Sequence, residues 1–155
     1  MPSPQRRRGT FVTGQLGARR RLRVQTTLDD LVAMYSGDRP DHATLSVGVV
    51  APVLSESDGQ KAPKYYYLRR VHSRDGERYG VISIYIDHRV FRRAPARFRR
   101  ELALPVLTAL PGLKIASARQ MLTISTADVE TSGLLRIPVN APGGDYIHLE
   151  MDLKP

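Results

Sequence analysis

Arg70 and His72 are the side chains in this sequence whose types and spacing best suit ligand chemistry. They stand two residues apart in a β-rich run, so both would point to the same face of a strand. A guanidinium and an imidazole on an otherwise apolar surface would suit a small-molecule pocket, which is typically apolar with a few polar groups. A solvent-exposed face carrying both side chains is an equally good interpretation of the pattern.

The hairpin that carries these residues can form in two registers. Two runs, Tyr65–His72 and Tyr79–Asp87, flank Asp75-Gly76, a strong turn signal because Gly tolerates the positive φ of a tight reversal. A two-residue loop would pair Arg70 with Val81 and His72 with Tyr79. A three-residue loop starting at Arg74 would instead place Leu68, Arg70 and His72 on one face with Gly80, Ile82 and Ile84. One residue of slip moves every side chain to the other face.

Other kinds of site find little support in the residue pattern. The chain has no Cys, and its four His are scattered at positions 42, 72, 88 and 148, so we expect no metal centre. It contains no phosphate-binding Gly loop and no Ser or Cys nucleophile motif. Paired carboxylates for acid–base catalysis are also missing near Arg70. We therefore expect a binding protein rather than an enzyme, with no cofactor.

A helix is predicted over residues 26–35, because Leu28, Leu31, Val32 and Tyr35 follow the spacing of one apolar face. Its free backbone N–H groups after Thr26 and Thr27 could bind an anion together with Arg70. Ordinary capping by Thr27 is the preferred interpretation, since Asp29 and Asp30 would repel an anion.

The remaining elements follow from hydrophobic spacing and breakers. Strands are predicted over 43–54, 113–126 and 146–153, and a short helix over 128–135. Residues 87–112 should be helical with breaks, with Pro95 and Pro105 in first helical turns and the Arg residues at 92, 93, 97, 99 and 100 on a solvated face. This order predicts an α+β fold with a largely antiparallel sheet and helices on one side.

Length and charge limit the classes of protein to which this chain can belong. A chain of 155 residues corresponds to about one domain, and it contains no apolar run long enough to span a membrane. The lack of Cys fits a cytoplasmic location. Of the net charge of +9, residues 1–23 contribute seven Arg and no acid. A basic arm of this kind indicates either a polyanionic partner such as DNA or a solvated tail.

Two stretches resemble a known family. The run Arg8-Gly9-Thr10-Phe11-Val12 resembles the last part of the wing in the winged helix-turn-helix of GntR-family transcription regulators. The body, roughly Thr26 to Leu153, resembles the UTRA effector-binding domain of their HutC-type branch, a fold related to chorismate lyase. The strand–Asp-Gly–strand pair, the spacing of Gln120, Ala127 and Leu134, and the terminal GDY strand carry this resemblance.

The resemblance implies the effector-binding and dimerisation part of a homodimeric, DNA-binding repressor. Its ligand positions fall on Arg70, His72 and Ile82, which favours the register with the three-residue loop, and on Thr26, Thr27 and Tyr146. The family's second Arg and its pocket acid are replaced by His72 and Ile82. The implied effector is therefore a less polar or aromatic, possibly carboxylated, small molecule. The DNA contacts would come from Arg6, Arg7, Arg8 and Thr10.

The implied organisation has three parts. Residues 1–14 form a disordered start and wing remnant, residues 15–25 a basic linker, and residues 26–155 the UTRA-like domain. The family's two strands before the GDY strand are missing, so this domain should lack a hairpin near residues 142–145. Two alternatives stay open: a chorismate-lyase-like enzyme, and a non-specific nucleic-acid binder acting through the basic arm.

Overall fold

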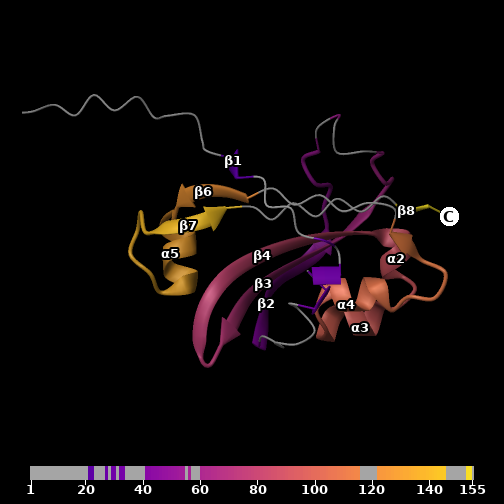
Figure 1. Ribbon diagram of the computed structural model, residues 1–155, viewed down its shortest axis with the longest axis horizontal. Coiled ribbons are helices and arrows are strands. Elements are labelled where there is room, and N and C mark those ends of the chain that lie inside the picture. The colour runs from indigo at the N-terminus through magenta and orange to yellow at the C-terminus, as the bar shows by residue number, and fades with distance from the viewer. Residues whose placement is uncertain are drawn as a thin grey trace, which may run out of the picture.

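The computed structural model describes residues 21–22, 27, 29–30, 32–33, 41–54, 56, 60–115, 122–145 and 153–154. Every described strand pair is antiparallel, and the fold is α+β, as predicted (Figure 1). The elements in chain order are β1 Arg21–Leu22, β2 Asp41–Val49, β3 Tyr65–Arg74, β4 Glu77–Asp87, α2 His88–Phe91, α3 Pro95–Arg100, α4 Ala103–Thr108, β5 Lys114–Ile115, β6 Leu122–Thr126, α5 Val129–Leu135, β7 Pro142–Asp145 and β8 Leu153–Lys154.

The β3–β4 hairpin combines a two-residue turn with a β-bulge. Asp75 and Gly76 have φ values of 51° and 81°, the left-handed conformation that a tight hairpin turn requires. Beyond the turn, the register shifts between His72 and Ser73, so that Arg70 lies opposite Ile82 and His72 opposite Gly80. The three-residue loop favoured above was therefore wrong. The bulge nevertheless produces the pairing that this loop was expected to give, because one extra residue on β4 shifts the ladder by one.

The central sheet has the strand order β2-β3-β4, with β3 in the middle. Alternate residues of a strand point to opposite faces. We call the face that carries Leu68, Arg70 and His72 the core face, and the face that carries Arg69 and Val71 the opposite face. Tyr66 and Leu68 on the core face pack with α2, α3 and α4; the hydrophobic core is completed by Ile86, Val90, Phe91, Phe98, Val106, Leu107 and Leu110.

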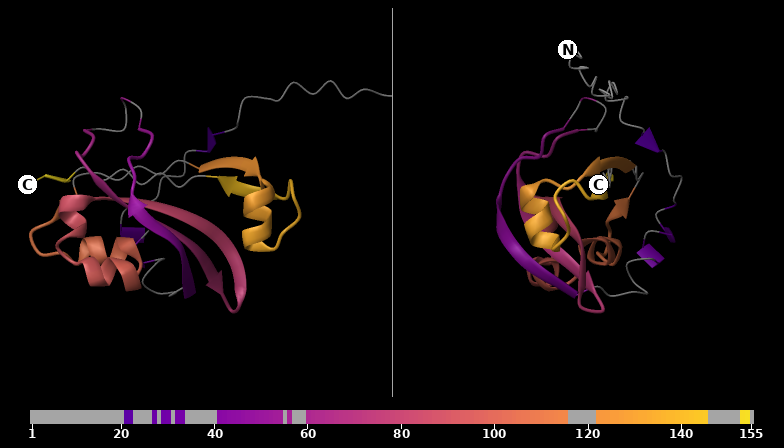
Figure 2. Two further views of the ribbon diagram at one scale, coloured as in Figure 1. Left: turned by 180° about the vertical axis from the view of Figure 1, so that it is seen from behind. Right: turned by 90° about the vertical axis from the view of Figure 1, so that its left-hand side faces the viewer.

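The helices do not all lie on one side of this sheet. Arg70 on the core face reaches α3, where it donates to main-chain oxygens of Phe98 and Glu101, whereas its neighbour Arg69 pairs with Glu130 of α5. The predicted arrangement therefore holds for α2, α3 and α4 but not for α5. Figures 1 and 2 show the bent hairpin between these two groups, with α2–α4 at one end and α5 with β6 and β7 at the other.

The segment after β4 forms three short helices, each starting for a local reason. The Asp87 carboxylate accepts the backbone N–H of Arg89 at 2.8 Å and caps α2. Pro95 is the first residue of α3, and Pro105 lies in the first turn of α4, as expected. Val90, Phe91 and Phe98 are buried, while the Arg residues at 92, 93, 97, 99 and 100 are exposed. The prediction of a solvated arginine face is thus confirmed.

A second sheet, of order β1-β6-β7, carries α5. Asp128 caps this helix by accepting the backbone N–H of Thr131 at 2.7 Å, which confirms the predicted short helix. A turn closed by the hydrogen bond from the Ala141 N–H to the Pro138 carbonyl leads directly into β7. No further strand lies between α5 and β7, and the two strands β4 and β7 each form the outer strand of their sheet in the described part of the chain.

The other predicted strands are described in part. β2 ends at Val49 rather than at Leu54, and Pro52 beyond it has no N–H to donate to a continuing ladder. The predicted strand 113–126 is described at its ends as β5 and β6, and the predicted strand 146–153 only at Leu153.

Candidate functional site

Arg70 is fully buried, with 0 % of its surface exposed. Its Nη1 donates to the carbonyl oxygen of Glu101 at 2.8 Å, and its Nη2 donates to that of Phe98 at 2.6 Å. These oxygens lie at the end of α3, where a helix leaves carbonyls without intrahelical partners. Arg70 therefore fastens α3 to the middle strand of the sheet, while its Nε has no hydrogen-bond partner in the described part of the chain.

The buried guanidinium keeps its charge. Burial lowers the pKa of Arg70, but the ordinary pKa of an arginine is so high that the group remains protonated near neutral pH. Its Nη1 and Nη2 donate to main-chain carbonyls rather than to a carboxylate. A buried positive charge in this setting favours a nearby anion, because charges removed from water are stabilised by opposite charge.

His72 is the polar side chain of the core face that has the fewest hydrogen bonds. Only 3 % of its surface is exposed, and neither Nδ1 nor Nε2 has a hydrogen-bond partner among the described residues. Burial, followed by the electrostatic influence of His42 and of the Arg70 guanidinium, lowers the pKa of His72 to about 4. The ring is therefore neutral at pH 7, with one nitrogen to donate and one to accept. Because buried polar groups are almost always paired, such a ring indicates that a further group binds there.

Three neighbours frame the imidazole. His42 lies opposite it on β2, with ring centroids 6.0 Å apart, and Tyr79 at the bulge presents an edge-on ring at 6.1 Å. Gly80 faces it on β4 and contributes no side chain. Of the described atoms, only those of the Ile82 side chain would lie within 4 Å of a Cβ placed on Gly80, the nearest at 3.7 Å. Gly80 thus leaves space for one more carbon atom at this place on β4.

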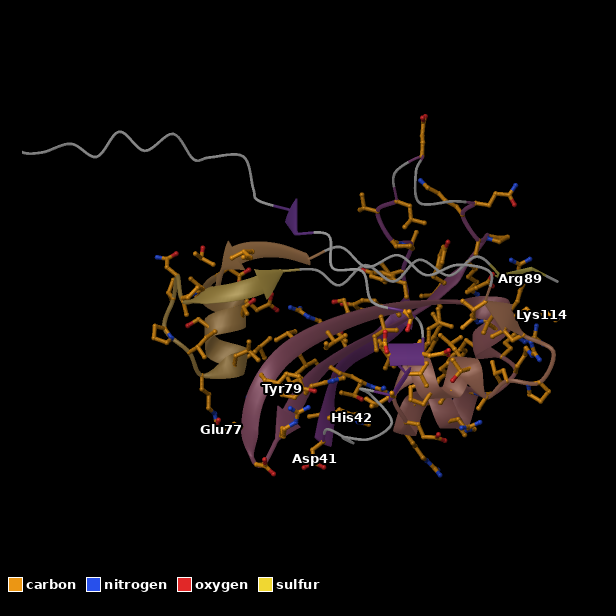
Figure 3. The ribbon with its side chains drawn as sticks, in the orientation of Figure 1. Asp41, His42, Glu77, Tyr79, Arg89 and Lys114 are labelled. Carbon is orange, nitrogen blue, oxygen red and sulfur yellow. The ribbon has the colours of Figure 1, made fainter. Side chains whose placement is uncertain are left out.

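These residues form what we call the His72 site: Arg70, His72, His42, Tyr79, Gly80 and Ile82. Figure 3 shows His42 and Tyr79 at the end of the sheet where the hairpin turns, close to Glu77. The Arg74 guanidinium lies over the Tyr79 ring, 5.6 Å from its centroid, and Glu77 faces Arg74 across the turn. The site therefore combines a neutral hydrogen-bonding ring with a buried cation and an apolar side chain.

The start of the helix predicted near Thr27 is capped by reciprocal hydrogen bonds between Thr27 and Asp30. The Asp30 carboxylate accepts the Thr27 hydroxyl at 2.6 Å and the Thr27 N–H at 3.1 Å, and Thr27 Oγ1 accepts the Asp30 N–H at 3.1 Å. Hydrogen bonds from the side chain and then the backbone of Thr27 lower the pKa of Asp30. Ordinary capping, the preferred interpretation, is thus observed, and it places a negative charge where an anion would have to bind.

The structure brings Arg70, His72 and Ile82 to one face, as the family resemblance implied. Six other predicted site residues lie outside the described residues: Thr26, Tyr146, Arg6, Arg7, Arg8 and Thr10. Sequence reasoning missed His42 and Tyr79. The pairing of β2 with β3 could have identified His42, but it cannot be set before the bulge at Thr44/Ser46 is known.

Two findings bear on the class of protein within the described part of the chain. No group of three or more His, Asp or Glu side chains is placed to hold a metal ion there. None of its helices is long and apolar enough to cross a membrane.

No known family model matches the sequence, and no curated protein sequence matches it. Function must therefore be inferred from the site itself.

Proposed function

We propose that this chain is the effector-binding part of a GntR/HutC-type transcription regulator, with a UTRA-like fold, and that a small carboxylated metabolite binds at the His72 site. The observation that carries the proposal is His72 itself: a buried, neutral imidazole with two unpaired nitrogens, set beside a buried guanidinium. A ligand that hydrogen-bonds this ring would give its nitrogens a partner, and an anionic ligand would also offset the buried charge of Arg70.

The hairpin register supports the family part of the proposal. The resemblance assigns three ligand positions to Arg70, His72 and Ile82, and these three meet on the core face only because of the bulge at Tyr79. The α+β architecture with antiparallel strands is compatible with the UTRA fold. The direct turn from α5 to β7 departs from the family, which has two additional strands there.

The chemistry around His72 favours one class of ligand. The charge of Arg70 acts on the ring, so a carboxylate placed there would be attracted and a cation repelled. Arg70 Nε remains as a donor, and the neutral imidazole can give or accept one further hydrogen bond. Ile82 and the Tyr79 ring offer apolar contact. Together these features favour an aromatic or apolar carboxylate over a sugar phosphate.

Arg70 would couple ligand binding to DNA binding. This side chain joins the His72 site to the end of α3, so a ligand that contacts its Nε could shift α3 relative to the sheet. In a homodimeric regulator such a shift would change the spacing of two DNA-binding heads, a coupling between separate sites. The regulator would respond to its ligand without catalysing a reaction.

The proposal can be tested by thermal unfolding of the purified chain with benzoate, 4-hydroxybenzoate and urocanate, and with benzamide as an uncharged comparison. At a concentration about 100-fold above Kd, a bound carboxylate should raise Tm by about 5–10 °C. His72→Phe keeps the ring packing but removes both nitrogens, and should abolish the rise.

Tyr67→Phe is the matched control, because it removes one exposed hydrogen bond to Ser83 on the opposite face and should leave the rise unchanged. An equal rise in wild type and His72→Phe would remove His72 from the site. An equal rise with benzamide and benzoate would show that charge plays no part in recognition.

A further inference from the structure

The helical segment after β4 concentrates positive charge. Residues 88–115, from α2 to β5, contain seven basic side chains and a single acid, Glu101. Residues 1–23 hold seven further Arg, whereas the rest of the chain has ten basic and fourteen acidic side chains. Outside residues 1–23, the excess positive charge of the protein therefore lies on this one segment.

Most cations of this segment are exposed and have no carboxylate partner. Asp87 pairs with Arg89 at 2.6 Å, and Glu101 pairs with Arg97 at 2.8 Å. Within the described part of the chain the other five form no ion pair, and we call them the arginine surface: Arg92, Arg93, Arg99, Arg100 and Lys114. Figure 3 shows Arg89 and Lys114 at the same end of the molecule, where α2 lies in Figure 1. These charges are therefore available to an external anion.

Two contacts order parts of the arginine surface. The Arg99 guanidinium lies over the rings of Phe91 and Tyr66, 5.3 Å and 5.9 Å from their centroids. Arg93 donates to the Pro111 carbonyl, which joins the loop after α2 to the turn before β5. Side chains that are already held in place lose less conformational entropy when they bind a partner.

The surroundings of these cations select a phosphate backbone over other anionic partners. Val90, Phe91 and Phe98 are buried in the core, so α2 and α3 have no apolar face to insert into a membrane. Residues 88–115 expose no large apolar side chain, so a protein partner would find no anchor there and a single-stranded nucleic acid no ring for stacking. Guanidinium groups, in contrast, bind phosphate oxygens through paired hydrogen bonds.

We propose that the arginine surface binds the phosphate backbone of duplex DNA without reading its sequence. Duplex DNA carries one negative charge per about 1.7 Å of its axis, so a short length of it can face several of these cations at once. Duplex RNA is recognised partly through its 2′-hydroxyls. The one hydroxyl of residues 88–115, on Thr108, bonds back to carbonyls of α4, which favours DNA.

This surface is separate from the DNA contacts that the family resemblance implies. Those contacts fall within residues 6–10, whereas the arginine surface belongs to the proposed effector-binding part itself. It would add affinity for DNA of any sequence, because phosphate contacts carry no sequence information. It rests on α2, α3 and β5, so the lack of a ligand at the His72 site would leave it unchanged.

A double substitution tests the arginine surface. Arg92→Gln with Arg100→Gln removes two exposed charges that form no ion pair within the described residues, so the fold should be kept. Binding of a random-sequence DNA duplex to the full chain is followed by fluorescence anisotropy between about 50 mM and 200 mM salt. The double variant should bind about tenfold more weakly than wild type. Its slope of log K against log salt concentration should be smaller by about 2, since two phosphate contacts are lost.

The matched control is Lys61→Gln with Arg136→Asn, which removes two exposed charges from other parts of the chain. Asn suits the left-handed backbone of residue 136, where φ is 59°. This control should keep the affinity and the salt slope of wild type. An equal loss in both double variants would overturn the proposal, because net charge alone would then explain binding.

Two further outcomes would also overturn it. If wild type does not bind the duplex, or if Arg92→Gln with Arg100→Gln binds it as wild type does, the arginine surface makes no contact with DNA. Duplex RNA and poly-glutamate serve as competitors, and each should displace the DNA less well than unlabelled DNA does. Stronger displacement by either one would assign the surface to that partner instead.

Discussion

Arg69 and Arg70 are adjacent on β3, yet they occupy opposite environments. Arg69 is partly exposed and pairs with the exposed carboxylate of Glu130 at 2.7 Å. Arg70 is fully buried and donates to two carbonyl oxygens at the end of α3. Strand alternation alone separates them, since successive side chains point to opposite faces. Residue type therefore says little about the role of an arginine until the face it occupies is known.

The core face itself divides into two halves along β3. Tyr66 and Leu68 pack into the hydrophobic core beneath α2, α3 and α4, whereas Arg70 and His72 bring polar groups to the same depth. The first half makes contacts that need no further partner. The second leaves both nitrogens of His72 unpaired among the described residues, which is the feature expected of a site rather than of a core.

The largest loss of stability is expected in the packed half. Leu68 is fully buried, so Leu68→Ala should lower the free energy of unfolding by about 4 kcal/mol through lost burial and a residual cavity. Urea unfolding followed by circular dichroism measures this. A loss below that of Arg69→Ala would contradict the view that this half is the core.

The next largest loss is expected at Arg70. Arg70→Ala leaves the Phe98 and Glu101 carbonyls without their donor, and should cost about 3 kcal/mol in urea unfolding. Hydrogen exchange should also show faster opening of α3 than of α5. Unchanged exchange in α3 would mean that Arg70 does not hold this helix in place.

Acid should lower the free energy of unfolding, because the buried His72 ring resists protonation. Its pKa is about 4 when folded and about 6.5 when unfolded, so the unfolded state binds a proton first as the pH falls. This cost disappears well above pH 6.5 and grows to about 3 kcal/mol near pH 4. His72→Phe should therefore lose less stability between pH 7 and pH 4.5 than wild type, measured by urea unfolding at both values. Equal losses would contradict a buried, neutral imidazole.

The smallest effect is expected at Arg69. Arg69→Ala removes a partly exposed ion pair and should cost less than about 1 kcal/mol. The cost should shrink further at high salt, because screening weakens exposed pairs. A loss as large as that of Arg70→Ala would erase the contrast between these two neighbouring residues.

Local chemistry made several features predictable from sequence. Asp75-Gly76 forms the turn because both residues accept positive φ, and Thr27 and Asp128 cap helices because their short oxygen-bearing side chains reach backbone N–H groups. Pro95 begins α3 because its φ suits a first helical turn. Each of these depends on a few neighbouring residues, so the α+β order could be predicted before the tertiary structure was known.

Tertiary structure alone decided the site. The bulge that places Arg70 opposite Ile82 depends on how β4 packs as a whole, because a ladder can shift by one residue without any local signal. The partners of Arg70 and the approach of His42 to His72 join residues far apart in the chain, and sequence spacing carries no measure of such distances. Sequence determined which residues could do chemistry, and long-range packing determined which of them meet.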